Sequence, residues 1–405
     1  MKKAIVTIHL WLGLSSGLVV CILGITGCIY VFEDELKLFF YRDKIYIDVP
    51  ANGSKKPLSE LRRIAQEAVG KDHPIQQIQI PAEENRSYLF RPALKRNPKV
   101  FTYFGEYEYY RMLYINPYTG MVIKNENAKY EFFNIVLGLH RNLLLNRNIG
   151  HYIVGTSVLL FVILLVTGLV LWWPKNIAAI KQRVSFIWKK NTKWKRKNYD
   201  LHNVLGFYSF FFALIIALTG LTWSFDWFSD SVQWLANGGA NKKSKPVFSD
   251  TTQVSDIVLP IDRLFYDLAK QNPDAKLFAI NIPTDKKAVL NISVYVNEQL
   301  SYNRKQFQYD QYSGKLLRST AFEDKNTGEK LKSMNYDIHV GRILSLPGKL
   351  LAFFIGLIVA SLPITGFYVW YGKRVKEKTT KKQLIQEKQF EITGNMQLSE
   401  LSANK

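Results

Sequence analysis

The sequence predicts a membrane protein whose fold is a four-transmembrane-helix bundle from a parallel tandem repeat, with two outer α+β domains. Three observations predict this fold. Four long runs contain no Asp, Glu, Lys or Arg, and motifs in the first half of the chain recur in the second half. The stretch that follows the first run and the stretch that follows the third run each contain one helical pattern and then several strand patterns.

Each apolar run is long enough to cross a bilayer, which takes about 20 residues for a helix. A charge-free run of this length is rare in the core of a soluble protein, so we expect all four to span the membrane. The runs are Ala4–Phe32, His151–Trp173, Asn203–Phe225 and Leu350–Gly372.

The first run has a second interpretation. Met1-Lys2-Lys3 before an apolar stretch resembles a signal peptide, and Ile25–Cys28 resembles a lipoprotein cleavage box. The run is longer than a usual signal core, and its Thr26-Gly27 pair recurs near the end of every other run. We therefore favour a first span that is retained.

Lys and Arg in the flanks predict the orientation of the spans. Basic residues gather at the N-terminus, in the loop after the second run and at the start of the tail, so we expect all three on the cytoplasmic side. The net charge of +21 is in part this topology signal and does not call for nucleic acid as a partner. The loop residues are Lys175, Lys181, Arg183, Lys189, Lys190, Lys193, Lys195, Arg196 and Lys197.

An internal repeat relates the apolar runs. Ile8–Gly13 matches Leu201–Gly206, and in both copies a Thr stands 17 residues after the His. Leu139-His140 matches Ile338-His339. Run one therefore corresponds to run three, and run two to run four, which predicts a pseudo-twofold axis along the membrane normal.

The outer loops repeat as well. Apolar residues at helical spacing predict a helix near Leu58–Val69 and another over about Ile261–Lys270. Alternating stretches such as Tyr109–Ile115 and Val289–Val296 predict strands. We expect each loop to form its own small α+β domain. The other matched motifs are Ile78–Pro81 with Ile280–Pro283, and the turn Asn116–Gly120 with Asp310–Gly314.

These patterns divide the chain into nine segments. The predicted segments are a first transmembrane helix at 1–32, an outer domain at 33–130, a membrane-proximal segment with His140 at 131–149, a second helix at 150–173, a basic cytoplasmic loop at 174–200, a third helix at 201–227, a second outer domain at 228–336, a membrane-proximal segment with the fourth helix at 337–372, and a cytoplasmic tail at 373–405.

Histidines at the membrane are the candidate functional residues. Five of the six lie at or near the ends of the runs, namely His9, His140, His151, His202 and His339. Ionisable residues at membrane depth are costly and usually functional. The predicted topology brings His9 and His202 to the cytoplasmic face, and His140 and His339 to the outer face.

Each matched pair lies across the predicted axis, so its two neutral imidazoles suit the two axial positions of a haem iron. Imidazole also binds Zn, Cu and Ni, but such a site would usually add a carboxylate or thiolate, and none lies beside these histidines within the helices. Asp200 and Asp337 each stand two residues before a histidine and could hydrogen-bond the rings to orient them.

His151 and the Thr-Gly pairs each have more than one interpretation. His151 has Lys349 at its position in the other half, and it could be an alternative ligand at the outer site, a partner of a haem propionate or an interfacial residue. The Thr-Gly pairs could let a flat cofactor approach closely, or they could pack helices together. The four pairs begin at Thr26, Thr167, Thr219 and Thr365.

Over about residues 1–375 the chain resembles the PepSY-associated transmembrane helix proteins, also called iron-regulated membrane proteins. The likeness is in the His-x-x-Leu-Gly openings at His9 and His202, in Leu139-His140-Arg141, and in Ile338–Arg342 with Pro347-Gly348. The recurrent Thr-Gly pairs add to it. The Asn116–Gly120 turn resembles the end of a PepSY domain; in the second, degenerate copy Gln311 replaces Pro117.

This resemblance implies a function in iron uptake at the bacterial inner (cytoplasmic) membrane. Characterised relatives include haem-containing reductases of ferric siderophores. The resemblance thus implies two haem b groups held by His9, His202, His140 and His339, with electrons passing from a cytoplasmic donor to a ferric siderophore outside.

These features bear on three candidate functions. The leading one is a ferric-siderophore reductase, an oxidoreductase acting on metal ions. The alternative is a PepSY-type ligand-binding or peptidase-regulating membrane module without redox activity, which leaves the paired histidines unexplained. A metal transporter that uses the histidines as a relay predicts carboxylates within the apolar runs, and those runs contain none.

Overall fold

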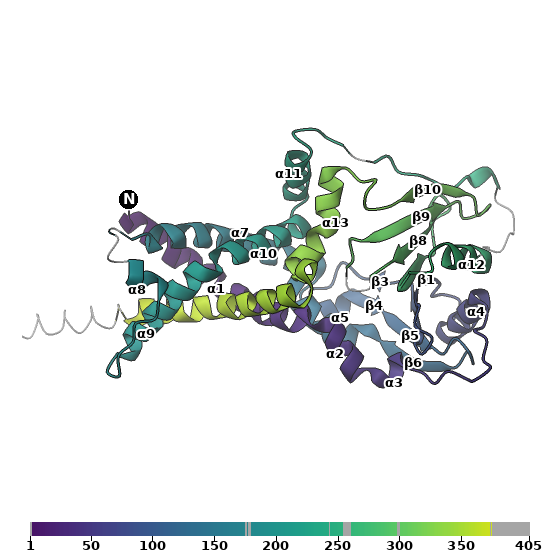
Figure 1. Cartoon of the computed structure of the whole chain (residues 1–405), viewed down its shortest axis with the longest axis horizontal. Coiled ribbons are helices and arrows are strands. Elements are labelled where there is room, and N and C mark those ends of the chain that lie inside the picture. Colours follow the sequence, from purple (N-terminus) through teal and green to yellow (C-terminus); the bar gives the residue numbers. More distant parts are fainter. Residues whose placement is uncertain are drawn as a thin grey trace, which may run out of the picture.

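The computed structural model describes residues 2–372 and 374, apart from 175, 177–179, 243, 254–260, 298 and 299. The molecule is elongated, with a bundle of long helices at one end and a sheet with its covering helices at the other (Figure 1). Of the predicted tail at 373–405, only Arg374 lies among the described residues.

Four helical spans form the bundle, as the sequence predicts. They are α1 (Lys2–Val31), α7 (Arg147–Trp172), a composite third helix over Trp194–Ser224 and a fourth over Arg342–Gly372. Only 17% to 33% of the most apolar window of each span is buried inside the protein, so most of its apolar surface faces outward. Such a surface is stable in a lipid bilayer. The third helix joins α9 (Trp194–Asp200), the π-helical turn η3 (Leu201–Leu205) and α10 (Gly206–Ser224).

Small residues bring the spans together. Helix α7 packs along both α1 and α10. The fourth span contacts α1 where Pro363 lies against Gly17, and it contacts the third helix where Leu362 lies against Gly206. Small residues allow this close approach between helices in a membrane. Helices one and three therefore stand diagonally opposite, each between helices two and four, as the repeat predicts.

An eight-stranded antiparallel sheet forms the other end of the molecule. Its strand order is β10-β9-β8-β7-β1-β2-β5-β6, and β3 (Lys95–Arg96) pairs separately with β4 (Tyr107–Tyr109). The eight strands are β1 (Ile75–Pro81), β2 (Tyr88–Pro92), β5 (Arg111–Ile115), β6 (Val122–Asn127), β7 (Leu277–Asn281), β8 (Leu290–Tyr295), β9 (Arg304–Tyr309) and β10 (Leu316–Thr320).

The expectation of two separate outer domains is corrected here. The two loops each contribute four strands, and β1 pairs with β7 to join them into one continuous sheet. Ile78 lies opposite Ile280, its counterpart in the repeat. The pseudo-twofold axis therefore passes between these two strands. Pairing satisfies the backbone N–H and C=O groups that either strand alone would leave open as a sheet edge.

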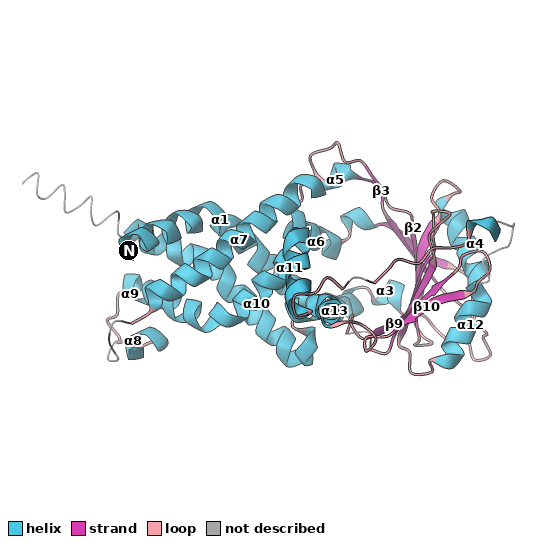
Figure 2. Cartoon of the chain, turned by 90° about the horizontal axis from the view of Figure 1, so that it is seen from above, coloured by secondary structure: helices cyan, strands magenta, loops and turns pink. Residues whose placement is uncertain are grey.

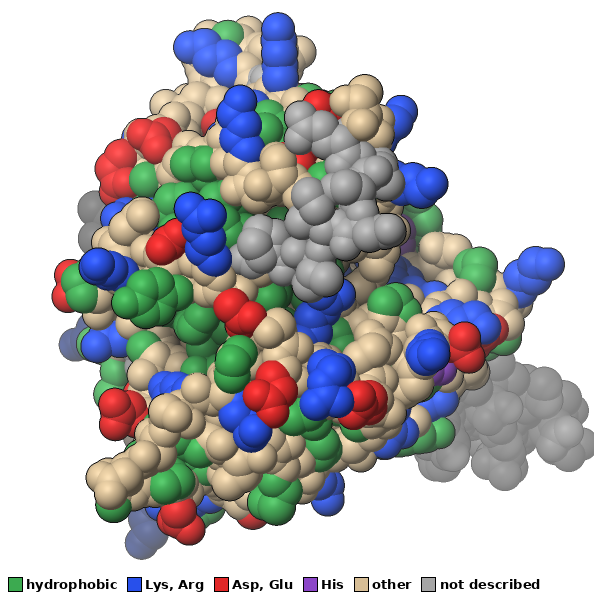
Figure 3. Space-filling model, turned by 90° about the vertical axis from the view of Figure 1, so that its right-hand side faces the viewer, with side chains coloured by type: hydrophobic (Ala, Val, Ile, Leu, Met, Phe, Trp, Pro, Cys, Tyr) green, Lys and Arg blue, Asp and Glu red, His purple; other side chains and the backbone are tan. Residues whose placement is uncertain are grey.

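One face of this sheet is covered by α4 (Leu58–Val69) and α12 (Ile261–Gln271), which lie on the side away from the bundle (Figure 2). Leu61 of α4 and Leu268 of α12 pack with Ile78 and Ile280 in a single apolar core. Figure 3 shows this distal end, where basic and acidic side chains are interspersed around exposed apolar ones. The predicted boundaries of α4 agree with the structure.

The two repeated turns adopt the same backbone conformation. The side chain of Asn116 accepts hydrogen bonds from the backbone N–H groups of Tyr118 and Thr119, and Gly120 has φ = 77°. Asp310 does the same in the second copy, where Gly314 has φ = 68°. Glycine is required because other residues adopt this left-handed conformation at a cost. The substitution of Gln311 for Pro117 therefore leaves the turn intact.

Shorter helices connect the bundle to the sheet. They include α6 and α13, which carry two of the candidate histidines. These and the remaining short elements are α2 (Glu33–Phe40), α3 (Arg42–Ile45), α5 (Tyr103–Glu106), η1 (Ala128–Tyr130), α6 (Phe132–Asn142), α8 (Ile180–Val184), α11 (Asp226–Ala236), η4 (Thr251–Gln253), α13 (Thr327–His339) and η5 (Arg342–Leu344).

Two ion pairs tie the halves together at the sheet end of the bundle. The Lys349 Nζ lies 2.6 Å from both carboxylate oxygens of Glu35, and Arg342 pairs with Asp34. Lys349 is 4% exposed, whereas the Glu35 side chain is 45% exposed. Burial alone would raise the pKa of Glu35, but the hydrogen bond from Lys349 and the nearby cations bring it below its usual value.

Replacing Glu35 by Gln is expected to lower stability by about 1 kcal/mol at neutral pH, the upper range for a pair with an exposed partner. A carboxylate whose pKa falls on folding stabilises the protein above its unfolded pKa of about 4.3. That contribution disappears as the pH falls through the lower, folded value. Thermal unfolding in detergent should show a wild-type advantage at pH 7 that shrinks below about pH 4. An advantage that is independent of pH would contradict this assignment.

Candidate functional site

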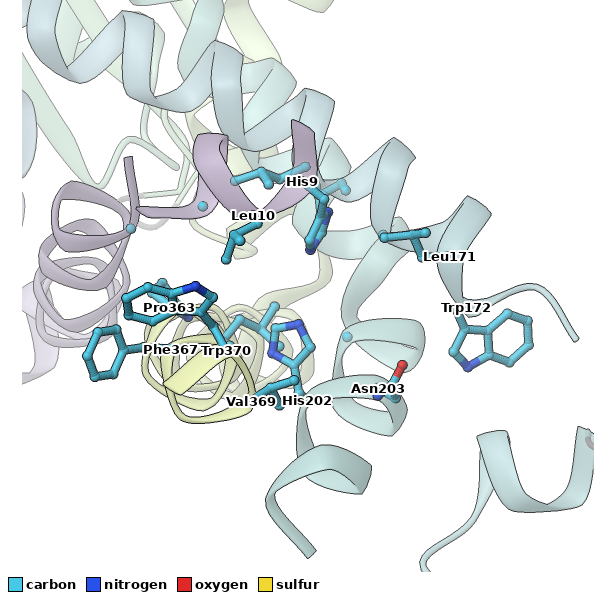
Figure 4. A pocket seen from close by; sticks show the side chains of 18 of the residues that line it. His9, Leu10, Leu171, Trp172, His202, Asn203, Pro363, Phe367, Val369 and Trp370 are labelled. Atoms are coloured by element: carbon cyan, nitrogen blue, oxygen red, sulfur yellow. The ribbon is translucent and has the colours of Figure 1, made fainter. Parts of the chain in front are cut away.

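The first histidine pair lies at the end of the bundle distant from the sheet. His9 of α1 and His202 of η3 have ring centroids 6.5 Å apart, with their planes at 85°. Both rings line a cavity of about 400 Å³ to which all four spans contribute. Figure 4 shows the two side chains pointing from different helices toward the same space. The volume falls in the range of sites that bind small molecules and cofactors.

A π-helical turn carries His202. The five residues Leu201–Leu205 wind more widely than the helix on either side, whereas His9 lies on regular α-helix. Such turns are rare and occur frequently at functional sites. The pair is therefore not strictly symmetric in its backbone, although its side chains are equivalent in the repeat.

The second pair lies at the sheet end of the bundle. His140 of α6 and His339 of α13 have ring centroids 6.2 Å apart, with their planes at 76°. Burial lowers the pKa of His140 to about 4, and burial together with the nearby His140 lowers that of His339 to about 3. Both rings are therefore neutral at physiological pH, which is the form of imidazole that binds a metal ion.

Local sequence fixes the two short helices that hold this pair. Glu131 caps α6 by accepting hydrogen bonds from the N–H groups of Phe133 and Asn134. The helix ends at Asn142, the following Leu143 has φ = 55°, and the chain then turns into α7. In the other half, Asn326 and Glu329 form a capping box at the start of α13. Such caps satisfy N–H groups that have no partner within the helix.

Glycines close both turns beside the second pair. A Cβ on Gly150 would lie 2.0 Å from the backbone oxygen of Asn142, and one on Gly348 would lie 2.1 Å from that of Gly341. Only glycine permits this contact between the start of a span and the end of the preceding short helix. The two glycines are equivalent in the repeat and hold His140 and His339 in equivalent places.

Every ring of the two pairs accepts or donates a hydrogen bond at Nδ1 with a threonine hydroxyl from another helix of its own half. The Nδ1 to Oγ1 distances are 2.9 Å for His9 and Thr167, 2.9 Å for His140 and Thr26, 3.0 Å for His202 and Thr365, and 2.9 Å for His339 and Thr219. Because Nδ1 is occupied in each ring, Nε2 is the nitrogen left to bind a ligand.

A glycine lies against each ring beside the threonine. The space of its missing side chain is taken by the imidazole, so the Thr-Gly pairs serve close packing of a ring against a helix backbone. The distances from an added Cβ to the ring Cε1 are 3.3 Å for Gly168 and His9, 3.1 Å for Gly366 and His202, 3.4 Å for Gly27 and His140, and 3.5 Å for Gly220 and His339.

The expectation that Asp200 and Asp337 orient the rings is wrong. Asp200 accepts hydrogen bonds from Trp188 and Arg196. Asp337 accepts three hydrogen bonds from the backbone and hydroxyl of Ser301 and the backbone of Tyr302. The threonine hydroxyls hydrogen-bond the rings instead. One spacing was a signal for two of them. Thr26 and Thr219 each stand 17 residues after a histidine, and 17 residues of helix rise about 26 Å, which brings both threonines to the depth of the second histidine pair.

The two remaining histidines lie outside the pairs. His151 Nδ1 hydrogen-bonds the carbonyl of Arg147 one turn earlier, and its ring contacts Tyr152. Its repeat counterpart Lys349 forms the ion pair with Glu35. His73 stacks on Tyr109 with the ring planes 8° apart, beyond the end of α4. The structure thus brings four of the five candidate histidines into pairs and leaves His151 aside.

The spacing of each pair fits one metal ion held from both sides. An imidazole nitrogen binds such an ion at about 2 Å and lies about 1 Å from its ring centroid, so two opposed rings have centroids about 6 Å apart. Across the described residues, no three His, Cys, Asp or Glu side chains form a group that could hold a metal ion. Each pair could therefore supply two imidazole nitrogens to one ion.

These features define a class: a multi-pass membrane protein with a buried histidine pair at each end of a four-helix bundle. The chain belongs to the PepSY-associated TM region family, because the model of that family matches residues 6–373. The family recognised from the sequence motifs is thereby confirmed. A search of curated proteins found no match.

Proposed function

We propose that this protein is a di-haem electron conduit of the bacterial inner membrane that reduces ferric siderophores on the periplasmic side with electrons from a cytoplasmic donor. His9 and His202 hold one haem b in this account, and His140 and His339 hold the other. The single observation that carries the proposal is the presence of two imidazole pairs, at 6.5 Å and 6.2 Å, at opposite ends of one bundle.

Haem b would supply a reversible one-electron carrier at each end. The chain's own residues prepare both places for it. Burial keeps the rings of His140 and His339 neutral, and Gly13 on α1 lines the first cavity without a side chain. The lining of that cavity is mostly apolar and includes Phe207. Hydrophobic surroundings of this kind tune the potential of a redox centre.

The family resemblance supports the choice of substrate. Its characterised members include reductases of ferric siderophores, and such chelators hold iron(III) through oxygen atoms. Hard oxygen ligands prefer the more highly charged ion, so one-electron reduction weakens the complex. Each iron(III) takes one electron, and each haem of the reduced protein would give one.

The positive face of the bundle supports the choice of side and donor. Lys189, Lys190 and Lys193 are exposed in the basic loop that leads into α9 and then into η3, the turn that carries His202. Basic residues of this kind mark cytoplasmic loops. The same charges would attract an acidic electron donor by electrostatic steering. With the first pair at the cytoplasmic face, the second pair and the sheet face the periplasm.

The purified protein, reduced with dithionite and freed of excess reductant, should test this function directly. Adding a ferric siderophore under anaerobic conditions should reoxidise the b-type absorbance and yield two ferrous ions per chain, trapped by a ferrous chelator. Absorbance that stays reduced would exclude the reductase while leaving the haem sites in place. Protein without b-type bands would favour the ligand-binding or regulatory module.

A further inference from the structure

Each of the four threonine hydroxyls donates its hydrogen bond to a backbone carbonyl of its own helix. A hydroxyl has one proton, and each of these groups lies within hydrogen-bond distance of the carbonyl one turn earlier in its own helix. The distances are 2.7 Å from Thr26 to Ile22, 2.8 Å from Thr167 to Ile163, 2.9 Å from Thr219 to Ile215, and 3.0 Å from Thr365 to Ser361. Because its one hydrogen is used in the bond to that carbonyl, the threonine oxygen can only accept a hydrogen bond from the imidazole.

A second observation gives the same direction independently. His339 Nδ1 lies 3.0 Å from the carbonyl oxygen of Ile216, and a carbonyl can only accept. The rings of His140 and His202 also hydrogen-bond the backbone, at Leu23 and Leu362. In each case this residue stands three positions before the threonine. Nδ1 is therefore the protonated nitrogen, and the lone pair is on Nε2.

We infer that Thr26, Thr167, Thr219 and Thr365 are positioning residues that fix the tautomer of the four histidines and so set the electron donation of each ring to its metal. The inference rests on the proposed function, because it concerns the same two haem sites. An acceptor at Nδ1–H makes the imidazole more basic and orients it, and its loss typically costs 10–100-fold in metal affinity or activity.

One asymmetry makes this inference specific. Three rings have a backbone hydrogen bond in addition to the threonine, at Ile216 for His339, Leu23 for His140 and Leu362 for His202. Among the described residues, His9 has Thr167 as its one hydrogen-bond partner. His9 and His202 face the same cavity. Removing the hydroxyl of Thr167 should therefore weaken ligation more than removing that of Thr365, although both changes affect one and the same haem.

The test compares Thr167→Val with Thr365→Val by spectroelectrochemical titration of the purified holoprotein. Valine keeps the shape of threonine but cannot accept the hydrogen bond from Nδ1–H, so His9 becomes a poorer electron donor to the ferric ion. We expect T167V to change the ferric-to-ferrous equilibrium at the inner site about tenfold toward the ferrous state, which is 59 mV for a one-electron couple. T365V should change it less, because the carbonyl of Leu362 remains.

Thr167→Ser is the matched control. Serine keeps the hydroxyl and its hydrogen bond to the carbonyl of Ile163, so the T167S potential should return to the wild-type value. A purely structural role in packing predicts the reverse order, because serine removes a methyl group that valine retains. Equal potentials in T167V, T365V and the wild type, with both haems bound, would overturn the inference. Wild-type protein without haem would instead overturn the proposed function.

Discussion

Replacing His202 by Ala is expected to lower the haem content from two per chain to one. The substitution removes one of the two imidazoles that would hold the first haem and leaves His9 alone in a cavity of about 400 Å³. The second pair lies at the other end of the bundle and shares no ligand with the first. The haemochrome absorbance per mole of protein should therefore fall by half, with the remaining spectrum still b-type.

The matched control for this prediction is His151→Ala. His151 is also a histidine on a membrane span, but its ring bonds the backbone of its own helix and stands outside both pairs. H151A should retain two haems. A variant set in which H151A loses haem and H202A keeps both would show that the pairs are assigned wrongly.

Replacing His339 by Ala is expected to abolish ferric-siderophore reduction while leaving the inner haem in place. Changes to groups that merely orient a ligand cost 10–100-fold, so loss of the ligand itself should lower the rate by at least about 100-fold. The inner site should still be reduced by the donor because His9 and His202 are intact. Stopped-flow spectroscopy with donor and ferric siderophore would separate reduction of the protein from reoxidation by the substrate.

The retained inner spectrum also serves as the folding control for H339A, since misfolded protein would lose both sites. Reoxidation of H339A at the wild-type rate would contradict the order of the two sites along the electron path. Fast reoxidation in H339A together with none in H202A would indicate that the siderophore is reduced at the first pair.

The sequence predicts the bundle well because its signals are local. Span length is read within single segments, and the repeat relates His9 to His202 and His140 to His339 without any knowledge of packing. The diagonal arrangement of helices follows from a parallel repeat with a twofold axis. These features need no information on side-chain geometry.

The joined sheet could not be predicted in this way. Pairing of β1 with β7 links Ile78 to Ile280, about half of the chain apart, and either strand could equally have closed a smaller separate domain. Matching motifs indicate equivalent strands but do not reveal that these strands meet at the axis. Pairing between edges is decided by tertiary arrangement, which local pattern does not encode.

The partners of the histidine rings were also missed for a physical reason. Asp337 is closer in sequence to His339 than Thr219 is, but residues two apart on a helix point to different sides. Thr219 lies on another helix, and only the rotation of that helix determines that its hydroxyl meets the ring at 2.9 Å. The depth of each threonine along the bundle was predictable from helix rise, whereas the direction in which its side chain points was not.

The most direct test of the paired imidazoles is low-temperature electron paramagnetic resonance of the fully oxidised protein. The ring planes of the two pairs cross at 85° and 76°. Near-perpendicular axial imidazoles leave two iron d orbitals almost equal in energy, which gives a highly anisotropic low-spin ferric signal. We predict two such signals per chain and no high-spin ferric haem. A high-spin spectrum, or a protein without haem signals, would contradict the account.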